Sequence, residues 1–349
     1  MPTESVVQRL TNGERISLVV CTLSRPEEIK RLLVALSGQS RKPDETLIVD
    51  ASADSRTSAV AQKFAGAALV PNLRYLKVTE QHRGLTKQRN YGLEHSSGDL
   101  IAFLDDDTIP EPSYFCELLA CAARNPDAVG IGGSITNEVL WSPSGNTRRS
   151  MSVFRWNGWA RSEGLRWWLR KCLGLASELP PGFMPTSGHG RPTGYPPDGN
   201  DYRVESVMGG VSCWRKSLFE KVKFGMFFAG YGLYEDMDFC IRAGTYGPIY
   251  LCSRARVAHY HAQSGRPSQF RYGVMVVRNG WFVWRRRWPA PKLADRCKWW
   301  AITVVAALCR MGDALRGPNR GQALADFLGR LYGMLIVWIN PPREQLKNN

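Results

Sequence analysis

Three consecutive aspartates, Asp105, Asp106 and Asp107, are the residues of this chain best suited to chemistry. They follow Ile101–Leu104, an apolar run that predicts a buried strand. Adjacent carboxylates repel one another and form strands poorly, so a positive group must balance them. Mg²⁺ and Mn²⁺ accept such oxygen ligands, commonly together with substrate phosphates. The alternative is a solvated turn in which an aspartate caps a helix starting near Pro112, but three carboxylates after a fully apolar strand argue against it.

The elements that must position these carboxylates alternate in type along the first part of the chain. Ile16–Cys21 predicts a strand, Glu27–Leu36 a helix with one apolar face, and Thr46–Val49 a second strand that ends on Asp50. A β-α-β unit of this kind has parallel strands joined by a right-handed crossover. Ligands of such sheets bind beyond the carboxyl ends of the strands, which is where Asp50 and the three aspartates fall.

Composition limits the classes of partner. The chain has 349 residues and 44% hydrophobic content, enough for a large α/β domain with additions or for two domains. The net charge of +15 points to an acidic partner: nucleic acid, an anionic membrane or a phosphorylated substrate. The nine cysteines form no CxxC pair, which argues against a zinc site and is typical of buried thiols in a reducing cytoplasm. The polar N-terminal stretch predicts no signal peptide.

Five segments in order resemble the inverting nucleotide-sugar glycosyltransferases of family 2, of the bacterial glycan-assembly type. They are VVCTLSRPEEIKRLLVAL, LIVDASAD, GLTKQRNYGLEHSSGDLIAFLDDD, MGGVSCWRK and GYGLYEDMDFCIRAG. The resemblance implies an α/β fold of the A-type, a Rossmann-like mixed and mostly parallel sheet, here with a C-terminal helical extension. It implies a nucleotide-sugar domain over residues 1–265, with residues 141–203 as a long insertion on the acceptor side, and a helical region over residues 266–349.

The resemblance also implies a metal site. The three aspartates match the family's DxD motif, with Asp107 as the first choice for direct coordination of Mn²⁺ or Mg²⁺. Asp105 would lie nearer the ribose or reach the metal through water, and the triple repeat leaves this register open. Asp106 would belong to the donor site. A histidine of the segment RARVAHYHAQSG would be a further ligand, with His259 preferred and His261 as the alternative.

The donor residues follow from the same resemblance. Asp50 would accept the N3–H of uracil or thymine, which predicts a UDP- or dTDP-sugar. The other residues assigned to the nucleotide and its diphosphate are Thr22, Arg25, Lys87, Arg89, Gly209 and Gly210. For Lys87 and Arg89 the alternative is a solvated basic helix end. Glycine pairs such as Gly209-Gly210 let the backbone approach a ligand closely.

Catalysis is assigned to Glu235 and Asp236. Inversion needs a base that takes the proton of the acceptor hydroxyl while its oxygen attacks the anomeric carbon. In the family this base is the aspartate of a Glu-Asp pair, which here is Asp236, while Glu235 would orient an acceptor hydroxyl. The alternative for Asp236 is a cap of the helix Met237–Ala243.

The C-terminal region predicts a membrane contact. Residues 266–310 contain ten basic side chains and one acid, interleaved with Trp281, Trp284, Trp288, Trp299 and Trp300. Tryptophan beside arginine suits a membrane interface. The apolar runs Ala301–Cys309 and Leu331–Ile339 are too short to span a bilayer. The alternative is a helical appendage in which these residues form ordinary core.

The sequence therefore predicts a metal-dependent glycosyltransferase that moves a hexose or deoxyhexose onto a glycan or polyprenyl-linked acceptor. We expect a cytoplasmic protein, peripheral on the inner face of the cytoplasmic membrane. A nucleotidyltransferase is an alternative, although CTLSRPEE is not its expected glycine-rich loop. A nucleic-acid-binding protein would explain the charge, but no such motif is present and the acidic centre would repel a polyanion. We therefore expect no nucleic acid partner.

Overall fold

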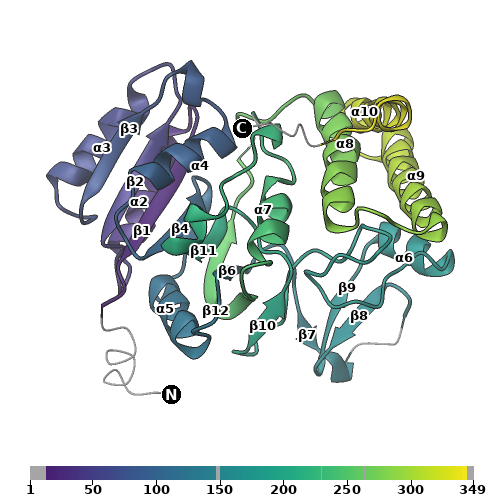
Figure 1. Ribbon diagram of the computed structural model, residues 1–349, viewed down its shortest axis with the longest axis horizontal. Coiled ribbons are helices and arrows are strands. Elements are labelled where there is room, and N and C mark those ends of the chain that lie inside the picture. The colour runs from purple at the N-terminus through teal and green to yellow at the C-terminus, as the bar shows by residue number, and fades with distance from the viewer. Residues whose placement is uncertain (1–12, 147–149, 229, 263, 344–349) are drawn as a thin grey trace. The chain divides into compact units, whose positions relative to one another are not determined.

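The computed structural model describes residues 13–146, 150–228, 230–262 and 264–343 (Figure 1). Contacts divide the chain into two units. The first contains the residues up to Val139 together with Thr193–Gly265, and the second contains Leu140–Pro192 and the residues from Arg266 onward. Residues 140–192, most of the insertion that the sequence analysis attached to the first domain, thus group with the C-terminal helices.

The first unit is built on a nine-stranded sheet. Its strands are β1 (Ile16–Thr22), β2 (Glu45–Asp50), β3 (Leu73–Lys77), β4 (Leu100–Asp105), β5 (Thr108–Pro110), β6 (Gly130–Ile135), β10 (Asp201–Val204), β11 (Val211–Arg215) and β12 (Ile249–His259). The order is β10-β12-β6-β11-β4-β1-β2-β3, with β5 paired to β12. Strands β1, β2, β3, β4, β6 and β12 run one way, and β5, β10 and β11 run the other. The predicted mixed, mostly parallel sheet is confirmed.

Helices cover this sheet. They are α2 (Pro26–Ser37), α3 (Arg56–Gly66), α4 (Leu85–Glu94), α5 (Tyr114–Arg124) and α7 (Glu235–Ala243), with short 3-10 turns at η1 (Glu80–His82), η3 (Lys216–Glu220) and η4 (Met226–Phe228). Helix α2 confirms the predicted helix Glu27–Leu36 and also includes Pro26 in its first turn, where the missing N–H of proline is not needed. The segment after β11 forms the 3-10 turn η3.

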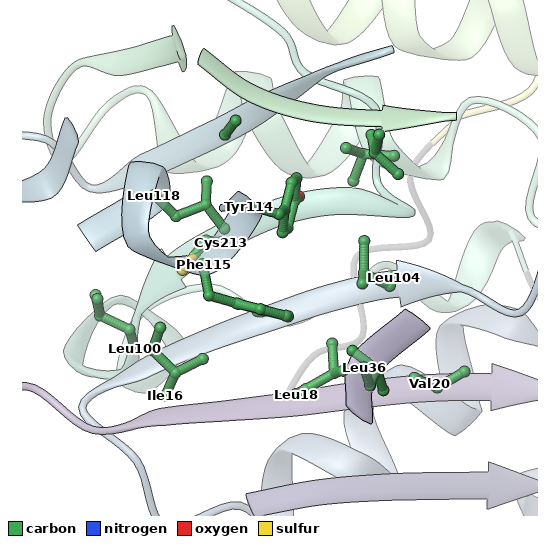
Figure 2. Packing of buried hydrophobic residues seen from close by; sticks show 14 of the residues in the cluster. Ile16, Leu18, Val20, Leu36, Leu100, Leu104, Tyr114, Phe115, Leu118 and Cys213 are labelled. Atoms are coloured by element: carbon green, nitrogen blue, oxygen red, sulfur yellow. The ribbon is translucent and has the colours of Figure 1, made fainter. Parts of the chain in front are cut away.

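Alternate side chains of the strands divide the core into two layers. Ile16, Leu18 and Val20 of β1 lie on the face that α2 and α5 cover, beside Leu36 and Phe115 (Figure 2). Between these positions, Val19 points to the opposite face and meets α4. On that opposite face, aromatic rings pack edge to face. Phe103 of β4 lies 5.2 Å from Phe224 in the loop after η3, and Trp214 of β11 lies 4.8 Å from Phe239 of α7, between ring centroids.

The second unit combines a small antiparallel sheet with helices. Its elements are β7 (Ser142–Pro143), η2 (Ser144–Asn146), β8 (Val153–Trp156), β9 (Trp159–Ser162), α6 (Leu165–Cys172), α8 (Gln269–Arg287), α9 (Leu293–Arg316) and α10 (Arg320–Ile339). The sheet order is β7-β9-β8. Helix α10 packs against both α8 and α9 (Figure 1).

Tryptophans from α8 and α9 form the core of this unit. Trp281, Trp284 and Trp299 are at most 6% exposed, and their ring centroids lie 4.9 to 5.5 Å apart. The Trp284 indole N–H donates to the backbone oxygen of Thr186 at 2.8 Å. These three rings therefore face one another, so the alternating tryptophan and arginine pattern does not mark a membrane interface at these positions.

One helix among the described residues, α10, is long and apolar enough to cross a membrane by length and composition, a test that core helices of soluble proteins also pass. The predicted apolar run Leu331–Ile339 covers only the C-terminal part of this helix. The structure extends the helix back to Arg320, because the apolar pattern continues through Leu324 and Leu328.

Close packing of α4 on the sheet gives a stability prediction. A Cβ at Gly92 would lie 2.4 Å from a methyl carbon of Val19 and 3.0 Å from one of Val49. We expect Gly92→Ala to destabilise the protein by about 1–3 kcal/mol, because the stiff valines cannot move aside. Gly66→Ala is the matched control in α3, where nothing lies within 4 Å of the added carbon, and it should stabilise by about 0.5–1 kcal/mol. Denaturant unfolding measures both, and equal behaviour of the two variants would contradict the packing argument.

Candidate active site

The carboxyl ends of β1, β2 and β4 bring the predicted acidic residues to one edge of the sheet. The strand register pairs Thr22 with Asp50 and Cys21 with Asp105. Gln88, which the sequence analysis did not single out, helps fix this edge: its buried amide donates to the backbone oxygens of Thr22 and Val49 at 3.0 and 2.9 Å. The side chain thus holds α4 against the ends of two strands.

The three successive aspartates face different partners. Asp105 accepts from Arg89 at 3.2 Å. Both oxygens of Asp106 are engaged, one by the Thr22 hydroxyl and one by Arg25, each at 2.7 Å. Burial raises the pKa of Asp106 to about 7, although its bonds to Arg25 and Thr22 oppose this.

Asp107 pairs with a histidine at the end of β12. One oxygen lies 3.2 Å from His259 Nε2, and the other accepts the backbone N–H of Ala262 at 2.7 Å. Burial alone would raise the pKa of Asp107, but the bond to His259 and the nearby positive charges lower it to about 2. Asp107 is therefore an ionised carboxylate at neutral pH.

Asp105, Asp107 and His259 offer ligand atoms that all lie within 4.8 Å of one another. Two carboxylates and one imidazole suit Mn²⁺ or Mg²⁺, and the absence of a thiolate ligand disfavours softer ions. The cluster also favours positive charge at this point: burial would lower the pKa of His259, but Asp107 and Glu138 raise it to about 10. The residues present therefore fit a divalent cation, and binding one there would compete with the proton on His259.

Glu138, which the sequence analysis missed, orients His259. Its carboxylate lies 2.8 Å from His259 Nδ1 and 2.9 Å from His261 Nε2. A carboxylate on one ring nitrogen leaves the other directed at the metal position, as in many metal sites. Asn137 adds a backbone clamp, because its side chain exchanges two hydrogen bonds with the main chain of His259. His261 lies beyond the strand, at φ +51°, and contacts Glu138 rather than the aspartates.

Arg25 links the aspartates to the segment that follows β12. Besides Asp106, its guanidinium lies 3.7 Å from Asp107 and donates to the backbone oxygens of Ala262 and Ser264. These contacts engage most of its donors. Arg25, predicted to bind nucleotide, is placed to hold this segment beside the acidic cluster.

A buried ion pair joins the two acidic motifs. Arg89 is 2% exposed and bonds both Asp105 and Glu235. Its guanidinium also lies 5.3 Å from the ring of Phe224, in cation–π range. Burial raises the pKa of Glu235 to about 8, although Arg89 opposes this. Glu235 Oε2 is buried and has no hydrogen-bond partner within the part of the chain that the structure describes.

Asp236 lies at the start of α7, next to the glycine pair. Its two oxygens accept the backbone N–H groups of Met237 at 2.8 Å and Gly209 at 3.3 Å. Burial raises its pKa. The residue before the pair, Tyr234, has φ +70°, a conformation that non-glycine residues adopt rarely and that is common at functional sites. The alternative role of Asp236 as a helix cap is not supported, because α7 begins at Glu235 with Tyr234 as its N-cap and without a side-chain cap hydrogen bond. The Asp236 side chain is partly exposed.

The glycine pair is held against both acidic motifs. A Cβ at Gly210 would lie 2.0 Å from the Asp105 carboxyl carbon, and a Cβ at Gly209 would lie 2.5 Å from Arg89 and 2.6 Å from Glu235. Only glycine fits at these two positions. Gly209 and Gly210 thus lie where the two motifs meet.

Asp50 and Lys87 differ in their surroundings. Asp50 is fully buried and accepts from the backbone N–H and hydroxyl of Ser52 and from the Tyr75 hydroxyl at 2.7 Å. Tyr75 lies on β3 and was not predicted, because one tyrosine in a strand carries no motif. Lys87, in contrast, is half-buried in the first turn of α4, and no ion pair of it occurs among the described residues.

A second group of possible ligands, Cys121, Asp201 and Cys252, lies between α5 and β12. Asp201 there accepts from Arg124 at 2.8 and 2.9 Å and from Asn125 at 3.0 Å. These bonds use both carboxylate oxygens, so this group has the character of a structural network.

Comparison with solved structures identifies the fold. The mannosyltransferase PcManGT from Pyrobaculum calidifontis, solved in complex with GDP-Man and Mn²⁺, superposes with a TM-score of 0.53 over 94% of this chain and 93% of that protein, at 14% identity. Such identity supports the fold alone. The protein therefore has the A-type glycosyltransferase fold that its sequence predicts.

Sequence comparison gives a family match over part of the chain. Residues 17–177 match Glycosyl transferase family 2. The glucosyl-dolichyl phosphate glucuronosyltransferase of Haloferax volcanii is 31% identical over 35% of this chain and 38% of its own length. The succinoglycan biosynthesis protein ExoM of Rhizobium meliloti is 29% identical over 42% of this chain and 47% of its own length. The matches thus span less than half of these relatives. The chain carries a glycosyltransferase family 2 domain, and the predicted resemblance is confirmed.

The contacts of the three aspartates predict their separate roles. We expect Asp107→Asn to weaken Mn²⁺ binding by roughly 10- to 100-fold, because it removes a charged ligand. Asp106→Asn should change Mn²⁺ affinity much less but lower the melting temperature, because Asp106 bonds Thr22 and Arg25. Electron paramagnetic resonance of free Mn²⁺ and thermal unfolding measure the two effects.

The control is Asp127→Asn, the same substitution in an exposed turn of the same unit. Equal loss of Mn²⁺ affinity in the Asp106 and Asp107 variants would contradict the assigned register.

Proposed function

We propose that this protein is a metal-dependent inverting glycosyltransferase that moves a hexose or deoxyhexose from a UDP- or dTDP-sugar to a hydroxyl of a glycan or polyprenyl-linked acceptor. Its role would be in cell-surface polysaccharide assembly. The observation that carries the proposal is the meeting of two acidic motifs at one sheet edge. Asp105, Asp107 and His259 offer a cation site, and Arg89 ties Asp105 to the Glu235-Asp236 pair.

The chemistry follows from that arrangement. Asp236 takes the proton of the acceptor hydroxyl, and the oxygen attacks the anomeric carbon on the face opposite the nucleotide. The bond from that carbon to the diphosphate oxygen breaks, and its electron pair leaves with the nucleoside diphosphate. Burial raises the pKa of Asp236, which makes its carboxylate a stronger base than an exposed aspartate.

The charge of the departing diphosphate must be balanced. A bound Mn²⁺ or Mg²⁺ would supply this balance as a Lewis acid at the phosphate oxygens. Lys87 is placed in the first turn of α4 to add a second positive charge. Arg89 contributes indirectly, since its bonds to Asp105 and Glu235 fix the two carboxylates that flank the glycine pair. Glu235 retains one unpartnered oxygen among the described residues for an acceptor hydroxyl.

The nucleobase assignment depends on Asp50. A carboxylate has about four acceptor positions, and Ser52 and Tyr75 use three of them here. An imide N–H of uracil or thymine would bond the fourth acceptor position. Because Asp50 is fully buried, the nucleobase would reach it only if the Tyr75 side chain moves aside. Guanine also carries an imide-like N–H, and the PcManGT structure contains GDP-Man, so GDP belongs in the test.

The proposed location is the cytoplasm, with peripheral attachment to the inner face of the cytoplasmic membrane, where a polyprenyl-linked acceptor would be presented. The support is the net charge of +15 and the apolar surface described below. The buried Trp281, Trp284 and Trp299 do not contribute to it.

The assigned base gives the first test. Asp236→Asn should lower turnover by about 10²–10⁴-fold while nucleotide affinity stays within about twofold, because the amide keeps the shape but cannot accept the proton. The assay measures nucleoside diphosphate release with whichever sugar nucleotide of a UDP- and dTDP-hexose panel supports turnover. Asp127→Asn serves again as the control. Undiminished turnover in Asp236→Asn would remove this residue as the base.

The donor class gives the second test. Calorimetric titration with UDP, dTDP and GDP should show binding of UDP or dTDP in Mn²⁺, and at least about tenfold weaker binding in EDTA. Asp105, Asp107 and His259 would hold the metal, whose charge would attract the diphosphate. Preference for GDP would overturn the assignment of uracil or thymine as the nucleobase and would leave the enzyme class in place. No binding of any nucleotide with Mn²⁺ present would overturn the proposed function.

A further inference from the structure

Helix α10 presents large apolar side chains outward. Leu324, Leu328, Leu331, Leu335 and Trp338 follow one another at spacings of four and three residues, which places them on one face of the helix. They are 43 to 77% exposed, and Trp338 is the most exposed of them. The water-facing side of a helix in a globular protein is normally polar. This helix has the opposite character.

Small residues on its other side explain how α10 is oriented. A Cβ at Gly329 would lie 2.1 Å from the backbone oxygen of Phe270 in α8, and a Cβ at Gly333 would lie 3.0 Å from Val277. The glycines therefore let the two backbones approach closely, as small residues do at close helix contacts. With the glycine face turned toward α8, the leucines are left outside.

Helix α9 has a similar outward stripe. Val304, Leu308 and Leu315 lie four and seven residues apart and are 43 to 66% exposed. Its buried side carries Trp299 and Ile302. Two neighbouring helices thus expose apolar stripes. Apolar side chains gathered in a stripe, unlike those scattered singly over an ordinary surface, indicate an interaction site.

Basic residues are exposed near the ends of these two helices. Lys292, Arg296 and Lys298 are exposed at the start of α9, and Arg316 and Arg320 are exposed at the turn between α9 and α10.

The acids of the two helices do not offset this charge. They are Asp295, Asp313 and Asp326, and only Asp313 is exposed. Asp313 pairs with Arg310 at 2.8 Å, and Asp326 is buried between Arg310 and Arg330. The surroundings of the apolar stripes therefore carry a net positive charge.

We infer that the outward faces of α9 and α10 bind the surface of an anionic lipid bilayer, with the leucines and Trp338 inserted among the headgroups and the basic residues on the lipid phosphates. The inference rests on the proposed function, which includes a lipid-linked acceptor. It deepens that function by naming the surface that would bind the membrane. It does not involve the sheet edge or the donor.

Charge decides between a bilayer and a second copy of the chain. In a symmetric dimer formed through these helices, the five exposed basic residues would lie near their copies, which costs free energy. An anionic bilayer satisfies both the stripes and the charges. A membrane crossing by α10 is disfavoured, because its inward face carries the Asp326–Arg330 pair and is already packed on α8.

The test is co-sedimentation of the full-length protein with vesicles, without donor or acceptor. We expect binding to vesicles of phosphatidylglycerol and phosphatidylcholine, and at least about tenfold weaker binding to phosphatidylcholine alone. The double variant Leu328→Glu/Leu335→Glu should lower the affinity for the anionic vesicles by on the order of tenfold or more, because each leucine loses its apolar contact with lipid.

The matched control is Val34→Glu/Leu69→Glu, which makes the same kind of change at apolar residues of the first unit that are 55 and 44% exposed. It should leave vesicle binding unchanged. Light scattering measures the oligomeric state of each protein, and circular dichroism checks that each variant is folded.

Equal vesicle binding by the two double variants would overturn the inference. A second outcome would also overturn it: the wild type is a dimer and binds no vesicles, and the α10 variant is a monomer. The stripes would then be an interface between copies of the chain. Nucleotide binding is measured separately. A protein that binds nucleotide but no vesicles would contradict this inference and leave the proposed sugar transfer in place. A protein that binds vesicles but no nucleotide would support this inference and contradict the proposed function.

Discussion

The structure of the first unit depends on the neutralisation of carboxylates gathered at one sheet edge. Arg89 has the central position, since it bonds Asp105, 16 residues away in sequence, and Glu235, 146 residues away. A buried arginine without its acids, or the acids without the arginine, would leave uncompensated charge that destabilises the fold strongly. The same ion pairs that make this edge stable therefore also place the two acidic motifs beside the glycine pair.

The electrostatics of the metal position follow from an excess of acid. Arg25 and Arg89 are each shared between carboxylates. Asp107 and Glu138 also lie against His259, and although burial opposes it, they raise the pKa of that imidazole to about 10. A protonated histidine takes the place of a cation in the metal-free protein. A divalent ion held by Asp105, Asp107 and His259 would replace that proton, so positive charge would lie against these carboxylates in both states.

The sequence predicted strands β2 and β4 well because each is a short apolar run that ends on an acidic residue, Asp50 or Asp105. It did not predict Glu138 or Tyr75, because each reaches the site from a strand or strand end without a motif, and only the sheet order brings them there. The tryptophans show the opposite limit. Trp281, Trp284 and Trp299 carry a recognisable pattern, but periodicity identifies an apolar face without saying whether protein or lipid covers it.

Helix α10 shows how that ambiguity is resolved. Gly329 and Gly333 allow α10 to pack closely on α8. Because the small residues of α10 face α8, its large residues lie on the other side of the helix. If water were the only surroundings, polar side chains at positions such as Leu328 and Leu335 would avoid the cost of hydrating apolar surface and would leave the α8 contact unchanged. The arrangement is therefore consistent with a second, apolar environment on the outer face. The exposed positive charge at both ends of α9 indicates that this environment is also anionic.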